Sequence, residues 1–243
     1  MNFSIYDIYV DASIDLDKKL SCSGMVTVNR RTNEIVDQKY LLIPDSTNNK
    51  GEIAAIWLGV ISAINIKQFE TQPYIVNIFS DSQISLFGVR TWILNWVRNY
   101  RNGLLYTASG PVSNQEWYRD IYHMIIMSGI KLKFFHIKGH VSINNPKSVF
   151  EAETMFRRSN YVSPNNIGLT PQTISCYNNL VDDRSRRAIY SYLDSGVLPD
   201  PSVTIGGIIP IIPNEYTIQD RKVYSENIKG GLNYPINYTM EVN

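Results

Sequence analysis

Residues 73–82 read PYIVNIFSDS and give the clearest indication of how this chain folds. Apolar, β-branched and aromatic residues run through this stretch almost continuously and stop at Asp81. A strand that is covered on both faces has this composition, because neither face alternates with polar positions that meet solvent. We therefore expect a central strand of a layered α/β sheet, with the Asp81 carboxylate at its carboxyl end.

Three further strands are expected before this one. The first is FSIYDIYVDAS, residues 3–13, which we expect to end at Asp11. LSCSGMVTVNR, residues 20–30, and EIVDQKYLLIP, residues 34–44, follow, and the polar turn between them predicts a hairpin. A helix should then begin near Glu52, which we place in its first turn. Its apolar positions fall at helical spacing, at Ile53, Ile56, Trp57, Val60 and Ile64.

The chain after the central strand alternates between helical and extended patterns. Helices are predicted for residues 83–100, 115–129 and 178–193, and a fifth strand for Lys131–Ile137. Residues 141–177 are rich in Asn, Ser, Thr and Pro and form an insert with one short helix, for which Ser148 is the expected cap. Ser195–Asn243 shows no helical period. The order of elements predicts an α/β fold, a five-stranded mixed sheet with helices on both faces.

Composition limits the classes of function. The chain has 243 residues, of which 44% are hydrophobic, which suits one domain with additions. Its 23 basic and 22 acidic residues leave a net charge of +1, so a nucleic-acid binder would need a local basic patch. Two cysteines make no paired-cysteine metal motif. Without a recognisable signal peptide or bilayer-length apolar run, we expect a cytoplasmic protein, in the host cytoplasm if a phage encodes it.

Four acidic residues fall at comparable places in the predicted fold. A right-handed crossover makes the first and fourth strands parallel neighbours, which brings Asp11 and Asp81 side by side. Glu52 opens the helix between them, and Asp182 lies early in the last helix. Taken singly, each could simply cap an element or favour a helix dipole. Together, converging carboxylates resist ionisation unless a cation binds, and they suit divalent ions that assist phosphodiester hydrolysis.

Five motifs, in order, resemble the type 1 ribonucleases H, members of the ribonuclease H-like fold. They are IYVDAS, NKGEIAAIWLGVISAI, IFSDSQ, FFHIKGHV and NNLVDDRSRRA. The segments around WILNWVRNY and GPVSNQEW are similar to the handle of bacterial members. The resemblance covers roughly residues 3–193 apart from the insert, and several short motifs in order are far more specific than any one of them.

The resemblance implies roles for individual residues. Asp11, Glu52, Asp81 and Asp182 would be catalytic carboxylates that hold two Mg²⁺ ions, for which Mn²⁺ is a possible substitute. Asp183, which follows Asp182, would point about 100° away from the site, as neighbours on a helix do. His140 would be a mobile catalytic histidine that assists proton transfer or product departure, carried on a glycine hinge. The implied activity is cleavage of the RNA strand of RNA/DNA hybrids, leaving 3′-hydroxyl and 5′-phosphate ends.

The resemblance also implies which residues contact the substrate. Polar side chains near the acidic helix would read the RNA strand through its 2′-hydroxyls. The DNA strand would lie against the handle, and a lysine at the end of the fifth strand would lie near a phosphate. These candidates are Asn48, Asn49 and Gln83 for RNA, Trp92, Trp96 and Asn114 for DNA, and Lys138 for phosphate. Turn formation explains Asn48 and Asn49 equally well, and core packing explains the two tryptophans.

The chain departs from the family pattern in three places. SIDLDKKLSCSG replaces a glycine-rich turn, the handle is poor in lysine, and the insert at 141–177 precedes the last motif. We therefore expect a ribonuclease H domain at residues 1–193 and an extension at 194–243 whose role the sequence does not indicate. Two alternatives remain: another nuclease of the same fold, of the junction resolvase or integrase type, and a hybrid-binding module without catalysis.

Overall fold

A computed structural model of the chain describes residues 4–158, 170–197 and 216–229. One six-stranded sheet dominates it, with strand order β3-β2-β1-β4-β7-β8. The strands are β1 (Ser4–Asp15), β2 (Leu20–Asn29), β3 (Glu34–Ile43), β4 (Tyr74–Ser80), β7 (Leu132–His136) and β8 (Ile228–Lys229). The first three pair antiparallel, whereas β4, β7 and β8 run parallel to β1. The five predicted strands and the mixed sheet are confirmed, and β8 is an addition from the C-terminal segment.

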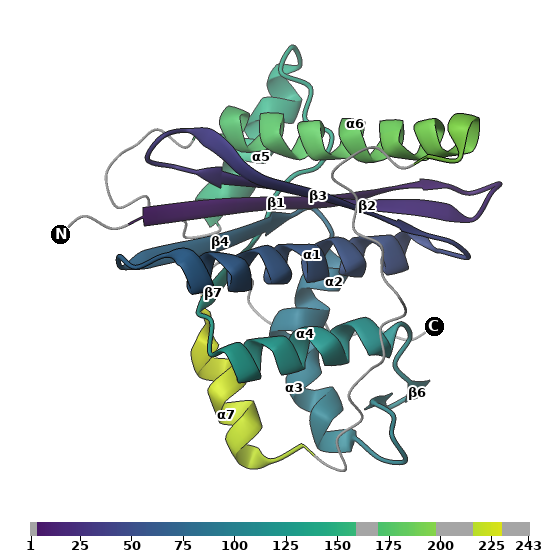
Figure 1. The fold of residues 1–243 in the computed structure, drawn as a ribbon, viewed down its shortest axis with the longest axis vertical. Helices are drawn as coiled ribbons and strands as arrows, with labels where there is room; N and C mark the ends of the chain where they lie inside the picture. Colours follow the sequence, from purple (N-terminus) through teal and green to yellow (C-terminus); the bar gives the residue numbers. More distant parts are fainter. Residues whose placement is uncertain (1–3, 159–169, 198–215, 230–243) are drawn as a thin grey trace.

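The central position of β4 follows from its composition. It pairs with β1 on one side and β7 on the other, and its inner residues are buried. Below it in Figure 1 lie α1 (Asn48–Phe69), α2 (Gln83–Phe87), α3 (Ile93–Trp96) and α4 (Gln115–Ser128), and above it lies α6 (Pro171–Ser195). The sheet therefore separates two apolar layers, which explains why its middle strand carries no polar face.

The first strand continues past the point where we expected it to end. Its parallel pairing with β4 stops at Tyr9 and Phe79, but its antiparallel pairing with β2 runs on to Asp15 and Leu20. Asp11 therefore does not end β1. It lies just beyond the last β1–β4 pair, where the edge of β1 is no longer covered by its neighbour.

The helix α1 begins earlier than the predicted first turn at Glu52. Thr47 is the N-cap, and its hydroxyl accepts a hydrogen bond from the Lys50 amide. Glu52 is consequently in the second turn, one turn nearer the middle of the sheet. The helix is the one in the described part of the chain that is long and apolar enough to span a bilayer, and 56% of its apolar window is buried inside the molecule. Packing between the sheet and α4 accounts for that composition (Figure 1).

The segment after β4 is helical, as predicted, but it is irregular. A π-helical turn, η1 (Gly88–Trp92), separates α2 from α3, and a short 3₁₀ turn, η2 (Val97–Asn99), ends the run. The loop that follows contains a small hairpin of β5 (Tyr106–Thr107) and β6 (Gly110–Pro111). A β-carbon on Gly88 would lie 2.3 Å from the Tyr118 ring, so a glycine is needed where this segment crosses α4.

The insert is more helical than its composition suggested. Its helix α5 (Pro146–Arg158) begins two residues before the predicted cap, because the Asn145 side chain accepts hydrogen bonds from the amides of Lys147 and Ser148. The last helix of the predicted set, α6, begins at Pro171 rather than near 178, with Thr170 as its N-cap. The part of the insert at 159–169 lies outside the described residues.

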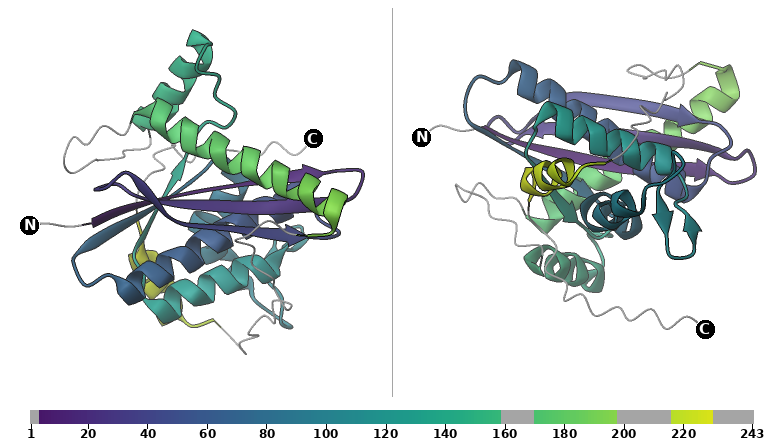
Figure 2. Two further views of the ribbon diagram at one scale, coloured as in Figure 1. Left: turned by 45° about the horizontal axis from the view of Figure 1, so that its top comes forward. Right: turned by 90° about the horizontal axis from the view of Figure 1, so that it is seen from below.

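The C-terminal segment contains structure that the sequence did not indicate. The helix α7 (Ile218–Asn227) begins with a reciprocal capping box between Thr217 and Asp220, and it leads directly into β8 beside β7. The fully buried Tyr224 donates its hydroxyl hydrogen to the Val89 carbonyl at 2.6 Å. Figure 2 shows α7 packed beside α4, far from α6. The expectation of no helical structure after Ser195 was therefore wrong for residues 218–227.

Candidate active site

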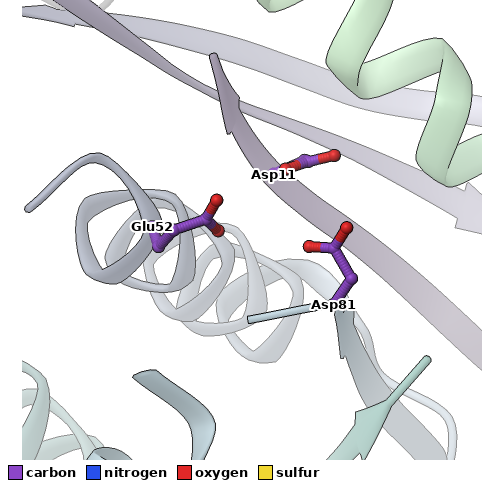
Figure 3. A group of neighbouring side chains, drawn as sticks. All are labelled: Asp11, Glu52 and Asp81. Carbon is purple, nitrogen blue, oxygen red and sulfur yellow. The ribbon is translucent and has the colours of Figure 1, made fainter. Parts of the chain in front are cut away.

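Three carboxylates converge where β4 ends beside β1. Asp11 comes from β1, Glu52 from the second turn of α1, and Asp81 from the position that follows β4. One oxygen from each lies within 4.8 Å of the others. Figure 3 shows the three side chains pointing toward one another. Parallel pairing of β1 and β4 thus brings Asp11 and Asp81 together as predicted, and α1 adds the third carboxylate from the face below.

The protein environment makes ionisation of these groups costly. Burial, followed by the nearby charge of Asp81, raises the pKa of Asp11 to about 8. Burial also raises the pKa of Glu52 well above its usual range, as do the charges of Asp11 and Asp81. The pKa of Asp81 is raised mainly by burial, and the charge of His140 opposes the shift. A bound cation would stabilise the charged forms of these three acids, which resist ionisation together.

Direct contacts hold Asp11 in place. Its Oδ1 accepts a hydrogen bond of 2.7 Å from the Ala12 amide, and its Oδ2 accepts one of 3.2 Å from the Asn178 side chain. The buried Oε2 of Glu52 has no hydrogen-bond partner among the described residues. Since carboxylate oxygens are the preferred ligands of Mg²⁺, an orphaned buried oxygen beside two aligned carboxylates fits a divalent ion. The donor set therefore suits a hard cation.

The fourth predicted carboxylate, Asp182, lies beside these three and contacts a different set of side chains. Asp182 Oδ1 accepts a hydrogen bond of 2.8 Å from Ser13, and its Oδ2 lies 2.8 Å from Arg186 and 3.6 Å from His140 Nδ1. The neighbouring Asp183 faces away and pairs with Arg187 at 2.9 Å. Asp182 rather than Asp183 thus lies at the site, and Ser13, Arg186 and His140 contact its carboxylate.

The end of the fifth strand differs from the expected hinge. The positive φ of this segment belongs to His140, at 49°, and Gly139 is not in the left-handed region. Instead, a β-carbon on Gly139 would lie 1.8 Å from Asp81 Oδ2. The glycine therefore leaves room for the Asp81 carboxylate. His140 itself is 74% exposed at the rim, and Lys138 forms an ion pair of 2.9 Å with Glu151 of the insert.

The other sequence-predicted contacts are scattered around the site. Asn48 lines the same cavity as the carboxylates, and Asn49 is exposed next to it at the start of α1. Gln83 is half-buried at the start of α2. In the handle, Trp92 is 37% exposed, but Trp96 is 9% exposed and packs edge-on against Tyr118. Only one of the two tryptophans therefore offers a ring to solvent.

Asn114 lies at the N-terminus of α4. It precedes α4 in a left-handed conformation with a φ of 53°, and its side chain does not cap the helix. Its carbonyl accepts a hydrogen bond from the Trp117 amide. A predicted DNA contact at this position stays a prediction.

Four residues at the site were not predicted from the sequence. Ser13 binds Asp182, Asn178 binds Asp11, and Arg186 and Tyr190 line the cavity. A sequence signal for three of them exists, because Asn178, Arg186 and Tyr190 lie four residues before, four after and eight after Asp182. That spacing places them on one face of a helix. Ser13 had no such signal, since the first strand was expected to end before it.

The sequence is similar to those of ribonucleases H. The RNase H family model matches residues 4–151. Ribonuclease H of Pseudoalteromonas translucida (strain TAC 125) is 28% identical over 134 residues, which cover 55% of this chain and 77% of the relative. Ribonuclease H of Neorickettsia sennetsu (strain ATCC VR-367 / Miyayama) is 33% identical over 137 residues, covering 56% and 81%.

A solved structure of LC9-RNase H1, described as a type 1 RNase H with the type 2 active-site motif, overlaps with a TM-score of 0.45 at 17% identity. The overlap covers 63% of this chain and 72% of that one.

Proposed function

The chain belongs to the ribonuclease H family, and from this we propose that it is an endoribonuclease that hydrolyses the RNA strand of RNA/DNA hybrids. The observation that carries the proposal is the convergence of Asp11, Glu52 and Asp81 within 4.8 Å. The products would be 3′-hydroxyl and 5′-phosphate ends. The matched residues 4–151 include these three carboxylates and His140, and Asp182 follows on α6.

Asp11, Glu52 and Asp81 would hold two Mg²⁺ ions, with Asp182 as a further ligand. When bound, divalent ions supply positive charge to the attacking and leaving oxygens of a phosphodiester displacement. Neighbouring residues of the chain would orient these carboxylates. Asn178 and the Ala12 amide fix the two oxygens of Asp11, and the absence of a side chain at Gly139 lets Asp81 lie against the end of β7.

His140 would take part in proton transfer at the rim of the site. Its exposed ring lies 3.6 Å from Asp182, so it can exchange protons with solvent on one side and with a reacting group on the other. An imidazole ring is suited to this work because one of its nitrogens can donate a proton while the other accepts one. His140 is therefore proposed to assist proton transfer or product departure.

Recognition of the hybrid would use residues near the start of α1 and α2 for one strand and residues of the handle for the other. Asn48, Asn49 and Gln83 are proposed to meet the RNA strand, whose 2′-hydroxyls lie along a wide, shallow minor groove. Trp92 and Asn114 are proposed to meet the DNA strand, and Lys138 a phosphate. Because Lys138 is paired with Glu151, a phosphate would have to displace that carboxylate or share the lysine with it.

The test is cleavage of an end-labelled RNA/DNA hybrid, set beside double-stranded RNA, single-stranded RNA and a four-way DNA junction. Each substrate is incubated with Mg²⁺, Mn²⁺ or EDTA. Metal-dependent cutting of only the hybrid's RNA strand is the expected result. Cutting of the junction with the hybrid left intact would place the chain in the resolvase branch of the fold. Binding of the hybrid without cutting under any metal would indicate a non-catalytic module.

A further inference from the structure

The cavity that contains the carboxylates continues beyond them. It has a volume of about 470 Å³, within the range of about 300–1,000 Å³ typical of small-molecule sites. From Asp11 it follows the extended part of β1 through Ile14 to Asp15, and it follows α6 from Asp182 to Tyr190. In Figures 1 and 2, α6 lies along β1 over this stretch. A phosphodiester held at the carboxylates would therefore leave room for a neighbouring nucleotide in the same cavity.

One face of α6 forms the wall of this extension. Asp182, Arg186, Ile189 and Tyr190 are spaced by four, seven and eight residues, so they lie on one side of the helix. Tyr190 is 57% exposed, whereas Ile189 beside it is buried at the base of the wall. The cavity that contains the carboxylates is thus also lined by an exposed aromatic side chain, Tyr190.

The wall contributes one cation to a cavity otherwise lined by the carboxylates of Asp11, Asp15, Glu52, Asp81 and Asp182. Among the described residues that line the cavity, Arg186 is the one permanent cation. It lies 2.8 Å from Asp182 and thereby offsets that negative charge, and half of its side-chain surface remains exposed to solvent. Tyr190 follows Arg186 by one helical turn. A cation and an aromatic ring one turn apart are the elements by which proteins hold single-stranded nucleic acid, because the cation meets the backbone and the ring stacks on a base.

We propose that Arg186 and Tyr190 form a subsite for an unpaired RNA nucleotide that adjoins the hybrid. The inference rests on the proposed function and adds a substrate preference to it. Within a duplex, each base stacks on its neighbours and offers no face to a protein ring, whereas an unpaired base offers a free face. The chain then favours hybrids whose RNA strand continues as a single strand over blunt hybrids of the same length.

The test measures binding of the full chain in EDTA, where cleavage is absent and cannot affect the result. Three hybrids of one sequence are compared: blunt, with a 5′ RNA overhang, and with a 3′ RNA overhang. Each overhang carries 2-aminopurine at its first unpaired position, since stacking on a ring changes its fluorescence. The wild-type chain should bind one overhang hybrid about 10-fold more tightly than the blunt hybrid, a value typical of one stacked base.

The variants separate stacking from other causes. Tyr190→Ala should remove the preference and the fluorescence change, and Tyr190→Phe should keep both because it retains the ring. Tyr192→Ala, an exposed tyrosine of the same helix outside the cavity, is the matched control and should behave as the wild type. Equal affinity of the wild type for all three hybrids would overturn the subsite, as would an equal loss in the Tyr192 variant.

Failure of the subsite and failure of the proposed function give different results. A chain that cuts hybrids with Mg²⁺ but shows no overhang preference retains the function and loses the subsite. A chain that prefers the overhang in EDTA but cuts no hybrid with either metal retains the subsite and loses the proposed activity.

Discussion

Gly139 and Asp81 are in such close contact that a β-carbon on the glycine would lie 1.8 Å from Asp81 Oδ2. The segment that follows β7 and the carboxylate after β4 are therefore packed together, and a side chain at residue 139 would have to displace one of them. This relationship explains the lysine-glycine-histidine strand end by packing, without requiring a hinge at the glycine.

Gly139→Ala is accordingly expected to displace Asp81 or the strand end. We predict a loss of hybrid cleavage of at least about 10-fold, with a fall of about 1–3 kcal/mol in the free energy of unfolding, typical of overpacking. Cleavage rates and denaturant unfolding of the same preparation provide the measurement. A folded variant that cuts at the wild-type rate would show that Asp81 does not need its observed position.

Asn178→Ala removes the side-chain donor to Asp11 Oδ2. The Asp11 carboxylate would then be held by the Ala12 amide alone, so we predict a lower kcat with little change in KM, because substrate binding does not depend on the Asn178 contact. Cys176→Ala, at an exposed position on the same helix, serves as the control and should leave both constants unchanged. An unaltered kcat in the Asn178 variant would contradict a positioning role.

The insert should reduce the phosphate affinity of Lys138. Because Glu151 pairs with it at 2.9 Å, Glu151→Gln should free the lysine and tighten hybrid binding. The gain should be at most about 5-fold, since exposed ion pairs contribute little once solvent screening is counted. Lys138→Ala should weaken binding and lower the slope of log affinity against log salt by about one.

Glu153→Gln is the matched control for the Glu151 variant. Glu153 lies on the same helix and pairs with Arg157 at 3.6 Å, so its neutralisation removes the same charge without releasing Lys138. Equal tightening in both variants would mean that net charge alone, and not the Lys138–Glu151 pair, sets the affinity.

His140→Ala should slow turnover without abolishing it. The histidine is at the exposed rim and contacts Asp182, whereas the three converging carboxylates lie deeper, so the site remains assembled without it. A decrease of about 10²-fold or more in kcat would match the usual contribution of general acid–base catalysis. An unchanged single-turnover rate and an unchanged steady-state rate would together remove His140 from the mechanism.

The sheet and the acidic group were predictable because their signals are local. The apolar run before Asp81 identified the central strand, and right-handed crossover then placed Asp11 beside Asp81. The exact ends of elements were not predictable, since they depend on partners far along the chain. β1 continues past Asp11 only because β2 pairs with it to Leu20. No pattern within residues 3–13 indicates that pairing.

The C-terminal elements illustrate the same limit. The helix α7 is held by Tyr224, whose hydroxyl meets a carbonyl 135 residues earlier in the chain. A single buried tyrosine gives no helical period, so sequence periodicity could not reveal the element. At the site, the placement of Asp182 against Ser13 and Arg186 likewise arises from side chains that meet only in the folded protein.

The most direct test of the central claim is a measurement on Asp81→Asn. Single-turnover cleavage of an end-labelled hybrid with Mg²⁺ is compared with hybrid affinity measured in EDTA. We predict that cleavage falls to the background seen with EDTA while affinity stays close to that of the wild type, because the change removes a proposed metal ligand and keeps the shape of the side chain. Cleavage near the wild-type rate in this variant would contradict the assignment of the carboxylate group as the site of hydrolysis.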